Sequence, residues 1–246
     1  MIWFIIATLV AFFIKGLCGF ANTLIFNGIL SYTANNINIS PLEVVLGYPS
    51  NIILVWKERK SLNWKIWLPL TALVVAGSIQ GIFLLKHTDA GLLKVIFGIA
   101  VIVIGVEMLF REMKSNRESS NRKPGGSKLV LVLIGIISGL LCGLYGVGAL
   151  LAAYVSRVAE NSHEFKANIC VVFVVENTIR IILYVATGIL TLSVLKQVVI
   201  LIPFMLAAVF LGMKSSSVLN EKIIKKIVIV LLILSGIVLI INNIPR

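Results

Sequence analysis

The chain opens with MIWFIIATLVAFFIKGLCGFANTLIFNGIL, residues 1–30, an apolar run interrupted in its second half by a glycine and several polar residues. A run of this length exceeds the roughly 20 apolar residues that an α-helix needs to cross the hydrocarbon core of a bilayer. Glycine at position 19, followed closely by Asn22 and Thr23, favours a break at that point rather than one continuous helix. The sequence therefore predicts a membrane-embedded segment made of two helical pieces.

The rest of the chain has the same apolar character. Hydrophobic residues make up 59% of the 246 residues and charged residues 13%, against about 45–50% and about 25% in typical soluble domains. Mean hydropathy is +1.05, which excludes a soluble domain, a disordered chain and a disulfide scaffold. We therefore expect an all-α polytopic membrane protein with about eight hydrophobic segments. These are Ile2–Leu30, Leu42–Trp56, Trp64–Leu85, Ala90–Phe110, Leu129–Val155, Phe165–Leu190, Leu192–Met213 and Ile223–Ile241.

The formal net charge of +12 does not indicate nucleic-acid binding, because the basic residues lie in short segments between the apolar runs. That distribution is typical of cytoplasmic loops in membrane proteins, so the expected partner is the lipid bilayer. The longest polar stretch, residues 111–128, falls near the midpoint of the chain. It divides the sequence into a first membrane repeat (1–122), a basic cytoplasmic linker (123–128) and a second membrane repeat (129–246).

The two halves share a pattern of residues. The sequence Leu17-Cys18-Gly19-Phe20 recurs as Leu141-Cys142-Gly143-Leu144. Further matches lie at one common offset of 131 residues: Gly81 with Gly212, Gly105 with Gly236, and Leu92-Leu93-Lys94 with Ile223-Ile224-Lys225. Glycines and a basic residue in one register predict an internal duplication.

Two topologies are compatible with these segments. If all eight cross the membrane, the Lys and Arg residues outside them divide 12 against 8 between the two sides, leaving out Lys15 and Arg180. If each half begins with a hairpin, broken near Lys15–Gly19 and Gly139–Gly143, the division becomes 16 against 4. Since cytoplasmic loops are enriched in Lys and Arg, hairpins and outside termini are favoured. The halves would then form an inverted repeat, as in many transporters. Each run is also long enough to cross as one tilted helix.

The glycine-broken first segment of each half resembles the TauE/SafE (sulfite exporter) family. A second pattern carries the same resemblance: Trp64, Leu70, Gly77, Gly81, Leu93-Lys94, Gly98 and Gly105. The resemblance extends over nearly the whole chain. It implies a multi-pass protein of the bacterial plasma membrane that transports a small anion, including sulfur-containing anions such as sulfite, thiosulfate or an organosulfonate.

The breaks are the expected anion site. A helix that begins inside the membrane offers unpaired backbone N–H groups and the positive end of its dipole, and both attract an anion. Two such helix starts, one from each half, would meet near the midplane. The alternative is that the glycines only permit close helix packing. The candidate substrate-binding residues are Gly19, Phe20, Ala21, Asn22 and Thr23 in the first half, and Gly143, Leu144, Tyr145 and Gly146 in the second.

Polar residues inside the later segments add further candidates. Glu176 and Arg180 are four residues apart on one predicted helix, a spacing that suits a mutual ion pair. Either they neutralise each other structurally, or Arg180 binds the anion while Glu176 carries a coupling proton. Asn177 lies between them, and Asn51 follows Pro49, a residue that would bend its helix toward the cavity.

Three residues near the breaks are candidates for the transport pathway. Lys15 is expected at the tip of the first hairpin, where a buried ammonium would favour an anion, although it could instead extend to an interface. Cys18 and Cys142 occupy equivalent positions, where a small thiol suits either close packing or weak hydrogen bonding.

The sequence contains no metalloprotease helix, nucleophile elbow, P-loop or dinucleotide fingerprint, so we expect neither an enzyme nor a bound metal or cofactor. The predicted function is a secondary permease for a small anion. A passive anion channel, a membrane scaffold and an intramembrane enzyme stay open as alternatives. No pattern in the sequence indicates an oligomeric state.

Overall fold

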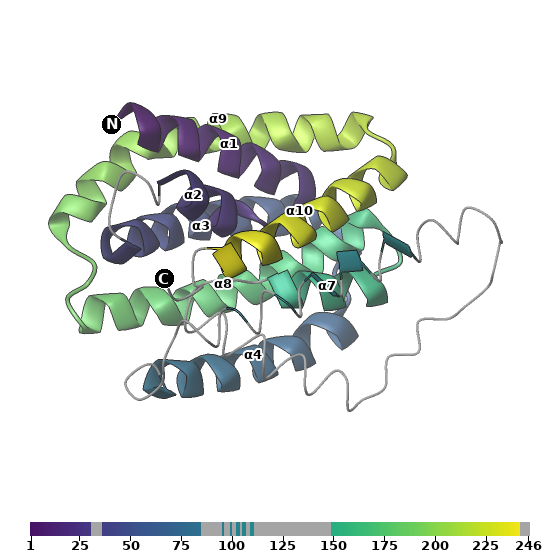
Figure 1. The fold of residues 1–246 in the computed structure, drawn as a ribbon, viewed down its shortest axis with the longest axis horizontal. Coiled ribbons are helices and arrows are strands. Elements are labelled where there is room, and N and C mark those ends of the chain that lie inside the picture. Colours follow the sequence, from purple (N-terminus) through teal and green to yellow (C-terminus); the bar gives the residue numbers. More distant parts are fainter. Residues whose placement is uncertain are drawn as a thin grey trace.

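The computed structural model describes residues 1–30, 36–84, 95, 99, 102–103, 105–106, 109–110 and 149–241. Every regular element in these residues is a helix, as the composition predicts (Figure 1). The elements are α1 (Ile2–Cys18), α2 (Asn22–Leu30), α3 (Asn36–Glu58), a 3₁₀ turn η1 (Arg59–Ser61), α4 (Trp64–Leu84), α7 (Ala149–Val158), α8 (Ser162–Ala186), α9 (Leu192–Val218) and α10 (Glu221–Ile241).

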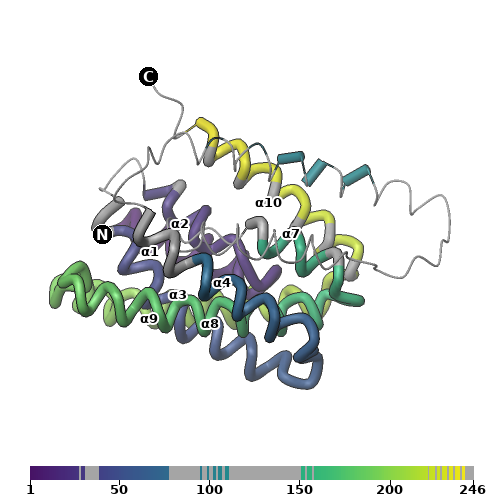
Figure 2. The backbone as a smooth tube through the Cα atoms, turned by 90° about the horizontal axis from the view of Figure 1, so that it is seen from below, coloured from purple at the N-terminus to yellow at the C-terminus, as the bar shows by residue number. Residues whose placement is uncertain are grey.

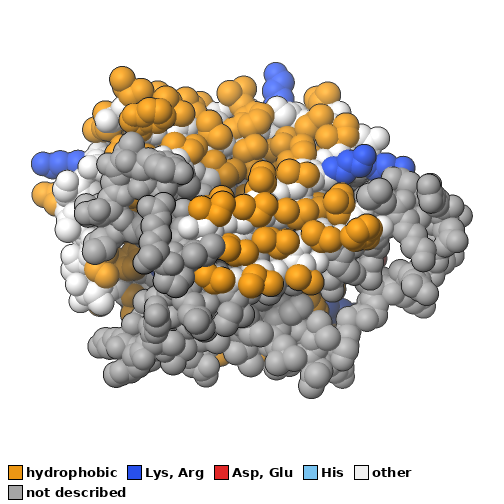
Figure 3. All heavy atoms as spheres, viewed as in Figure 1, with side chains coloured by type: hydrophobic (Ala, Val, Ile, Leu, Met, Phe, Trp, Pro, Cys, Tyr) orange, Lys and Arg blue, Asp and Glu red, His pale blue; other side chains and the backbone are white. Residues whose placement is uncertain are grey.

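Among the described residues, three helical stretches are long and apolar enough to cross a membrane: Ile39–Ser61, Ser162–Ala186 and Leu192–Val218. Two shorter apolar helices are Ile2–Cys18 and Trp64–Gly77. Large apolar side chains cover much of the face shown in Figure 3. Many large apolar residues are exposed, and Val199 on α9, for example, is 67% exposed. Apolar exposure on this scale is found where a protein surface faces lipid.

The first apolar segment reverses direction at its glycine. Gly19 caps α1 in the left-handed conformation (φ 88°), and Ala21 also has a positive φ of 72°. Beyond this break, the ring of Phe26 on α2 packs edge-on against Phe12 on α1, with centroids 6.4 Å apart. In a continuous helix these residues would be about 21 Å apart along the axis. The chain therefore folds back as a helical hairpin. The turn lies at Gly19–Ala21, and Lys15 is in the last turn of α1 rather than at the tip.

Small residues let α1 and α9 approach closely. Gly16 and Gly212 face each other, so a Cβ added to Gly212 would lie 3.0 Å from the Gly16 Cα and 2.9 Å from the Leu17 backbone nitrogen. The distance to the Leu17 nitrogen is shorter than real Cβ atoms show, and the distance to the Gly16 Cα is at that limit. This contact fixes the hairpin against the longest helix described, as small residues do in other membrane proteins.

We expect Gly212→Ala to lower the free energy of unfolding by about 1–3 kcal/mol, because the added methyl group must separate two backbones. Thermal unfolding in detergent measures the loss. The matched control is Ala207→Val, which adds bulk to an exposed position of the same helix. Equal stability of the two variants would contradict this account of the α1–α9 contact.

The end of α3, the start of α8 and the C-terminal part of α9 lie at one end of the bundle. There His163, at the start of α8, contacts Glu58 at the end of α3 at 2.8 Å, and Lys57 donates to the Met213 carbonyl near the end of α9 at 3.4 Å. The N terminus lies at the opposite end, and α10 runs back toward that same side (Figures 1 and 2). The basic stretches 57–65, 157–166 and 214–226 therefore lie at one end, and the basic stretch 111–128 lies outside the described residues.

Candidate functional site

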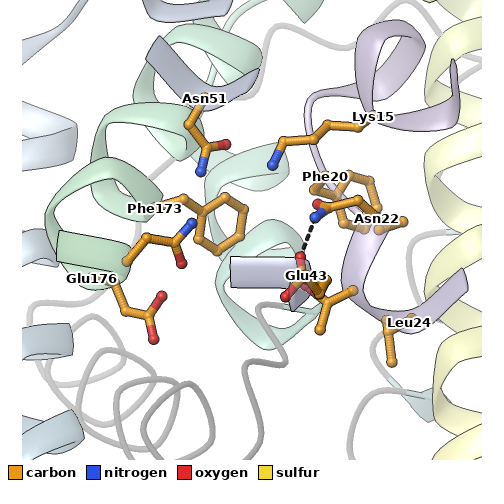
Figure 4. Close-up of a pocket in the computed structure, with 11 residues that line it drawn as sticks. Lys15, Phe20, Asn22, Leu24, Glu43, Asn51, Phe173 and Glu176 are labelled. Atoms are coloured by element: carbon orange, nitrogen blue, oxygen red, sulfur yellow. Dashed lines mark hydrogen bonds between the residues drawn. The ribbon is translucent and has the colours of Figure 1, made fainter. Parts of the chain in front are cut away.

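A pocket lies directly beside the α1–α2 break, between α1, α2, α3 and α8 (Figure 4). The space between its lining atoms, open mouth included, is about 390 Å³. Most of its polar groups come from helices that are distant in sequence. The lining residues are Lys15, Phe20, Ala21, Asn22, Thr23, Leu24, Glu43, Asn51, Phe173, Glu176 and Asn177.

Lys15 supplies a buried positive charge to this pocket. Its side chain is 1% exposed, and its Nζ donates a long hydrogen bond of 3.4 Å to the Gly47 carbonyl oxygen. The ammonium also lies 5.7 Å from the centre of the Phe12 ring. Within the described part of the chain, no carboxylate forms an ion pair with it. A buried ammonium held only by a carbonyl and a ring favours a negatively charged ligand.

At the start of α2, two side-chain donors converge on one carboxylate. The Asn22 amide donates to Glu43 Oε1, and Thr23 Oγ1 donates to the same oxygen at 2.9 Å. Glu43 comes from α3 and is 3% exposed. Asn22 and Thr23, at the start of α2 where an anion is expected, therefore donate to the Glu43 carboxylate of the protein itself.

Asn51 is buried with an unsatisfied amide. The residue is 0% exposed, and neither its Nδ2 nor its Oδ1 atom has a hydrogen-bond partner among the residues that the structure describes. Figure 4 shows the amide directed into the pocket on the same side as the Lys15 ammonium. Leaving a buried polar group without a partner costs about 1–3 kcal/mol. Such a group at a pocket wall is a ready donor or acceptor for a ligand.

Arg180 lies behind the pocket wall rather than on it. Its Nε is 3.6 Å from Glu176 Oε1, an ion pair without a hydrogen bond, since neither atom has a hydrogen-bond partner. Its guanidinium donates instead to Tyr184 at 2.9 Å and to Ser40 at 3.0 Å. Glu176 and Asn177 line the pocket and Arg180 does not. The role expected for Arg180 as a direct anion ligand therefore has no support in the pocket geometry.

The cysteines near the break are buried. Cys170 on α8 donates from Sγ to the Gly19 carbonyl oxygen at 3.4 Å, so it satisfies a backbone acceptor freed where α1 ends. Cys18 is also fully buried, but it does not line the pocket. Gly19 faces Lys166 rather than the pocket, because a Cβ at this position would lie 3.0 Å from Lys166 Cγ.

The structure brings together most first-half residues that the sequence singled out. Lys15, Asn22, Thr23 and Asn51 join Glu176 and Asn177 of the second half. The corresponding second-half residues Cys142, Gly143, Leu144, Tyr145 and Gly146 lie outside the described residues.

Glu43 is a pocket residue that was not predicted from the sequence. The available signal was a carboxylate directly after Pro41-Leu42, at the start of an apolar segment. With it, the pocket and its immediate surroundings hold two cations, Lys15 and Arg180, and two carboxylates, Glu43 and Glu176. The fixed charges therefore balance when both carboxylates are ionised.

The family model described as sulfite exporter TauE/SafE matches residues 4–239 of the chain. No curated protein and no solved structure matches the chain. The matched region includes every residue of the pocket.

Proposed function

The chain belongs to the sulfite exporter TauE/SafE family, and we propose that it is a secondary permease that carries a small anion through the pocket at the α1–α2 break. Sulfite, thiosulfate and organosulfonates are the substrate class. The observation that carries the proposal is Asn51, a fully buried amide without a partner that faces the same pocket as the Lys15 ammonium.

A sulfur oxyanion matches both of these groups. Its charge offsets that of Lys15, and its several acceptor oxygens can receive hydrogen bonds from the Asn51 and Asn177 amides. The start of α2 adds backbone N–H groups and the positive end of a helix dipole. A cation as substrate would be repelled by Lys15 and by the helix start.

Charge balance in the pocket argues for coupling to protons. An entering anion meets Lys15 and Arg180 already balanced by Glu43 and Glu176. Protonation of either glutamate leaves one net positive charge for the substrate. Protonated Glu43 also releases Asn22 and Thr23 to the anion, since a neutral acid is a weaker acceptor than a carboxylate. By linkage, proton and anion then strengthen each other's binding.

The wider architecture proposed is an inverted pair of repeats, 1–122 and 129–246, joined by the linker 123–128. Each repeat begins with a re-entrant hairpin, and the second hairpin brings Gly143, Leu144, Tyr145 and Gly146 to the same anion. The basic loops face the cytoplasm and both termini lie outside, in a bacterial plasma membrane. Segregation of basic loops to one end of the described bundle supports this orientation.

Flux into proteoliposomes tests the function. Purified protein should accumulate labelled sulfite or thiosulfate against its concentration gradient when a proton gradient is imposed. Glu43→Gln should transport with a reduced dependence on pH, and Glu43→Asp serves as the ionisable control. Downhill flux that never exceeds equilibrium would identify a passive channel. If the protein transports no anion, the alternatives that stay open are a membrane scaffold and an intramembrane enzyme.

Asn51→Leu separates binding from stability. Because it removes an unsatisfied buried amide, we expect the free energy of unfolding to stay unchanged or to rise. Loss of one hydrogen bond to a charged ligand, worth about 1.5–3 kcal/mol, should weaken anion binding about 10- to 150-fold. Anion titration and thermal unfolding of the same protein measure both effects. A less stable variant with wild-type affinity would show that Asn51 is structural.

A further inference from the structure

A second pocket lies at the basic end of the bundle, where the ends of α1, α3 and α9 meet the start of α8. The space between its lining atoms, open mouth included, is about 350 Å³. Its charged and titratable lining residues are Lys57, Glu58, His163 and Lys166. Glu58 contacts His163 at 2.8 Å, and the lining holds two ammonium groups, Lys57 and Lys166, against this one carboxylate.

Lys166 is the central feature of this second pocket. It lies in the second turn of α8 and is only 2% exposed. Its Nζ donates to the hydroxyl of Ser216. No ion pair joins it to any carboxylate of the described residues. A buried ammonium in a cavity, satisfied by one neutral hydroxyl, is suited to bind an anion.

The two pockets lie on either side of the same helical turn. Lys15 lines the first pocket and its neighbour Gly16 lines the second. The stem of Lys166 packs against Gly19, the residue at which α1 ends. The end of α1 therefore forms the wall between a central pocket and a pocket at the basic end.

We propose that the second pocket is a separate binding station for the same small oxyanion, with Lys166 as its principal ligand and Lys57 beside it. The proposal rests on the proposed function for the identity of the ligand. An anion at the basic end would occupy this station before or after the central pocket. Passage between the two would require movement of the α1 end, where Gly16 lines the second pocket and Gly19 ends the helix with a positive φ.

A structural role is the competing explanation. Lys57 donates to the Met213 carbonyl, and Lys166 donates to Ser216, so both lysines could simply stabilise the C-terminal end of α9. That role predicts lower stability on substitution but no change in any anion-dependent property. The two explanations therefore differ in a measurable way.

Thermal unfolding of the detergent-solubilised protein, titrated with sulfite at constant ionic strength and with gluconate as the reference anion, tests the proposal. In Lys15→Met, sulfite should still stabilise the protein in part. The double variant Lys15→Met/Lys166→Met should lose this remaining stabilisation, so that the sulfite concentration giving half-maximal stabilisation is at least tenfold higher than in Lys15→Met. Lys214→Met, at an exposed position of α9, should behave as wild type.

A second pair of variants keeps Lys166 intact. Ser217 lines the pocket and is exposed, so Ser217→Asp should fold and repel the anion, and Ser217→Asn is its neutral control. Complete loss of stabilisation in Lys15→Met alone, or an unchanged remainder in both the double variant and Lys15→Met/Ser217→Asp, would overturn the second station. If the central site is wrong and the station is right, Lys15→Met has no effect while Lys166→Met removes all stabilisation.

Discussion

Arg180→Met is expected to lower the free energy of unfolding by about 3–5 kcal/mol, the range for breaking a buried ion pair from one side. The substitution leaves Glu176, 3% exposed, without its cation. It also removes the donor shared by Ser40 and Tyr184, a contact that joins α3 to α8. Reversible unfolding in mixed micelles measures the loss. Arg59→Met, on the exposed 3₁₀ turn, is the matched control and should cost less than about 1 kcal/mol.

Adding Glu176→Gln to the same protein should recover part of the stability, because no unpaired charge is then buried. The double variant tests function as well as folding. If Glu176 carries a coupling proton, the folded double variant should lose proton-driven accumulation of the anion. Full accumulation by that variant would remove both residues from the transport cycle.

Lys15→Met is expected to reduce kcat/KM for anion transport at least 100-fold while the protein still folds. Methionine fills a similar volume, and Lys15 makes no direct ion pair among the described residues. The excess negative charge then left on Glu43 and Glu176 can be neutralised by binding one proton, so the structure should lose little. The anion, in contrast, loses its nearest cation in a site from which water is largely excluded. Initial rates of uptake into proteoliposomes measure the effect.

Lys15→Arg and Lys196→Met are the controls. Arginine keeps the charge at position 15 and should restore part of the activity. Lys196 is exposed near the start of α9, at the end of the bundle opposite the basic stretches. Its loss should leave transport unchanged. Wild-type rates in Lys15→Met would show that the substrate does not pass the first pocket.

Local sequence signals were sufficient to predict the broken first segment. An apolar run with Gly19, Asn22 and Thr23 near its middle predicts two helical pieces, and the structure ends α1 at Cys18 and begins α2 at Asn22. The fold-back itself depends on Ala21, whose positive φ no propensity for alanine predicts. Tertiary contacts such as Phe12 with Phe26 stabilise that conformation.

Helix ends were predicted less well than helix cores. The sixth segment was expected at Phe165–Leu190, whereas α8 spans Ser162–Ala186. Asn161 caps this helix by accepting the Glu164 N–H at 2.9 Å, so the helix extends into polar residues that hydropathy leaves out.

Contacts between distant segments could not be predicted from one sequence. The bond from Asn22 to Glu43 joins two helices, and the position of Arg180 behind the pocket wall depends on Ser40 and Tyr184. Spacing along one helix predicts the Glu176–Arg180 pair but not which of the two faces the cavity. Tertiary packing therefore determines which charged residues meet at the pocket, and the sequence alone does not predict them.

The central claim is that the transported anion binds in the pocket at the α1–α2 break. The most direct measurement is an experimental structure of the protein in lipid nanodiscs, determined with and without saturating sulfite or thiosulfate. We predict new density within hydrogen-bond distance of Lys15 Nζ and the Asn51 amide, with the Glu43 carboxylate moved away from Asn22 and Thr23. An anion bound only elsewhere, with the first pocket unchanged and transport intact, would contradict the account.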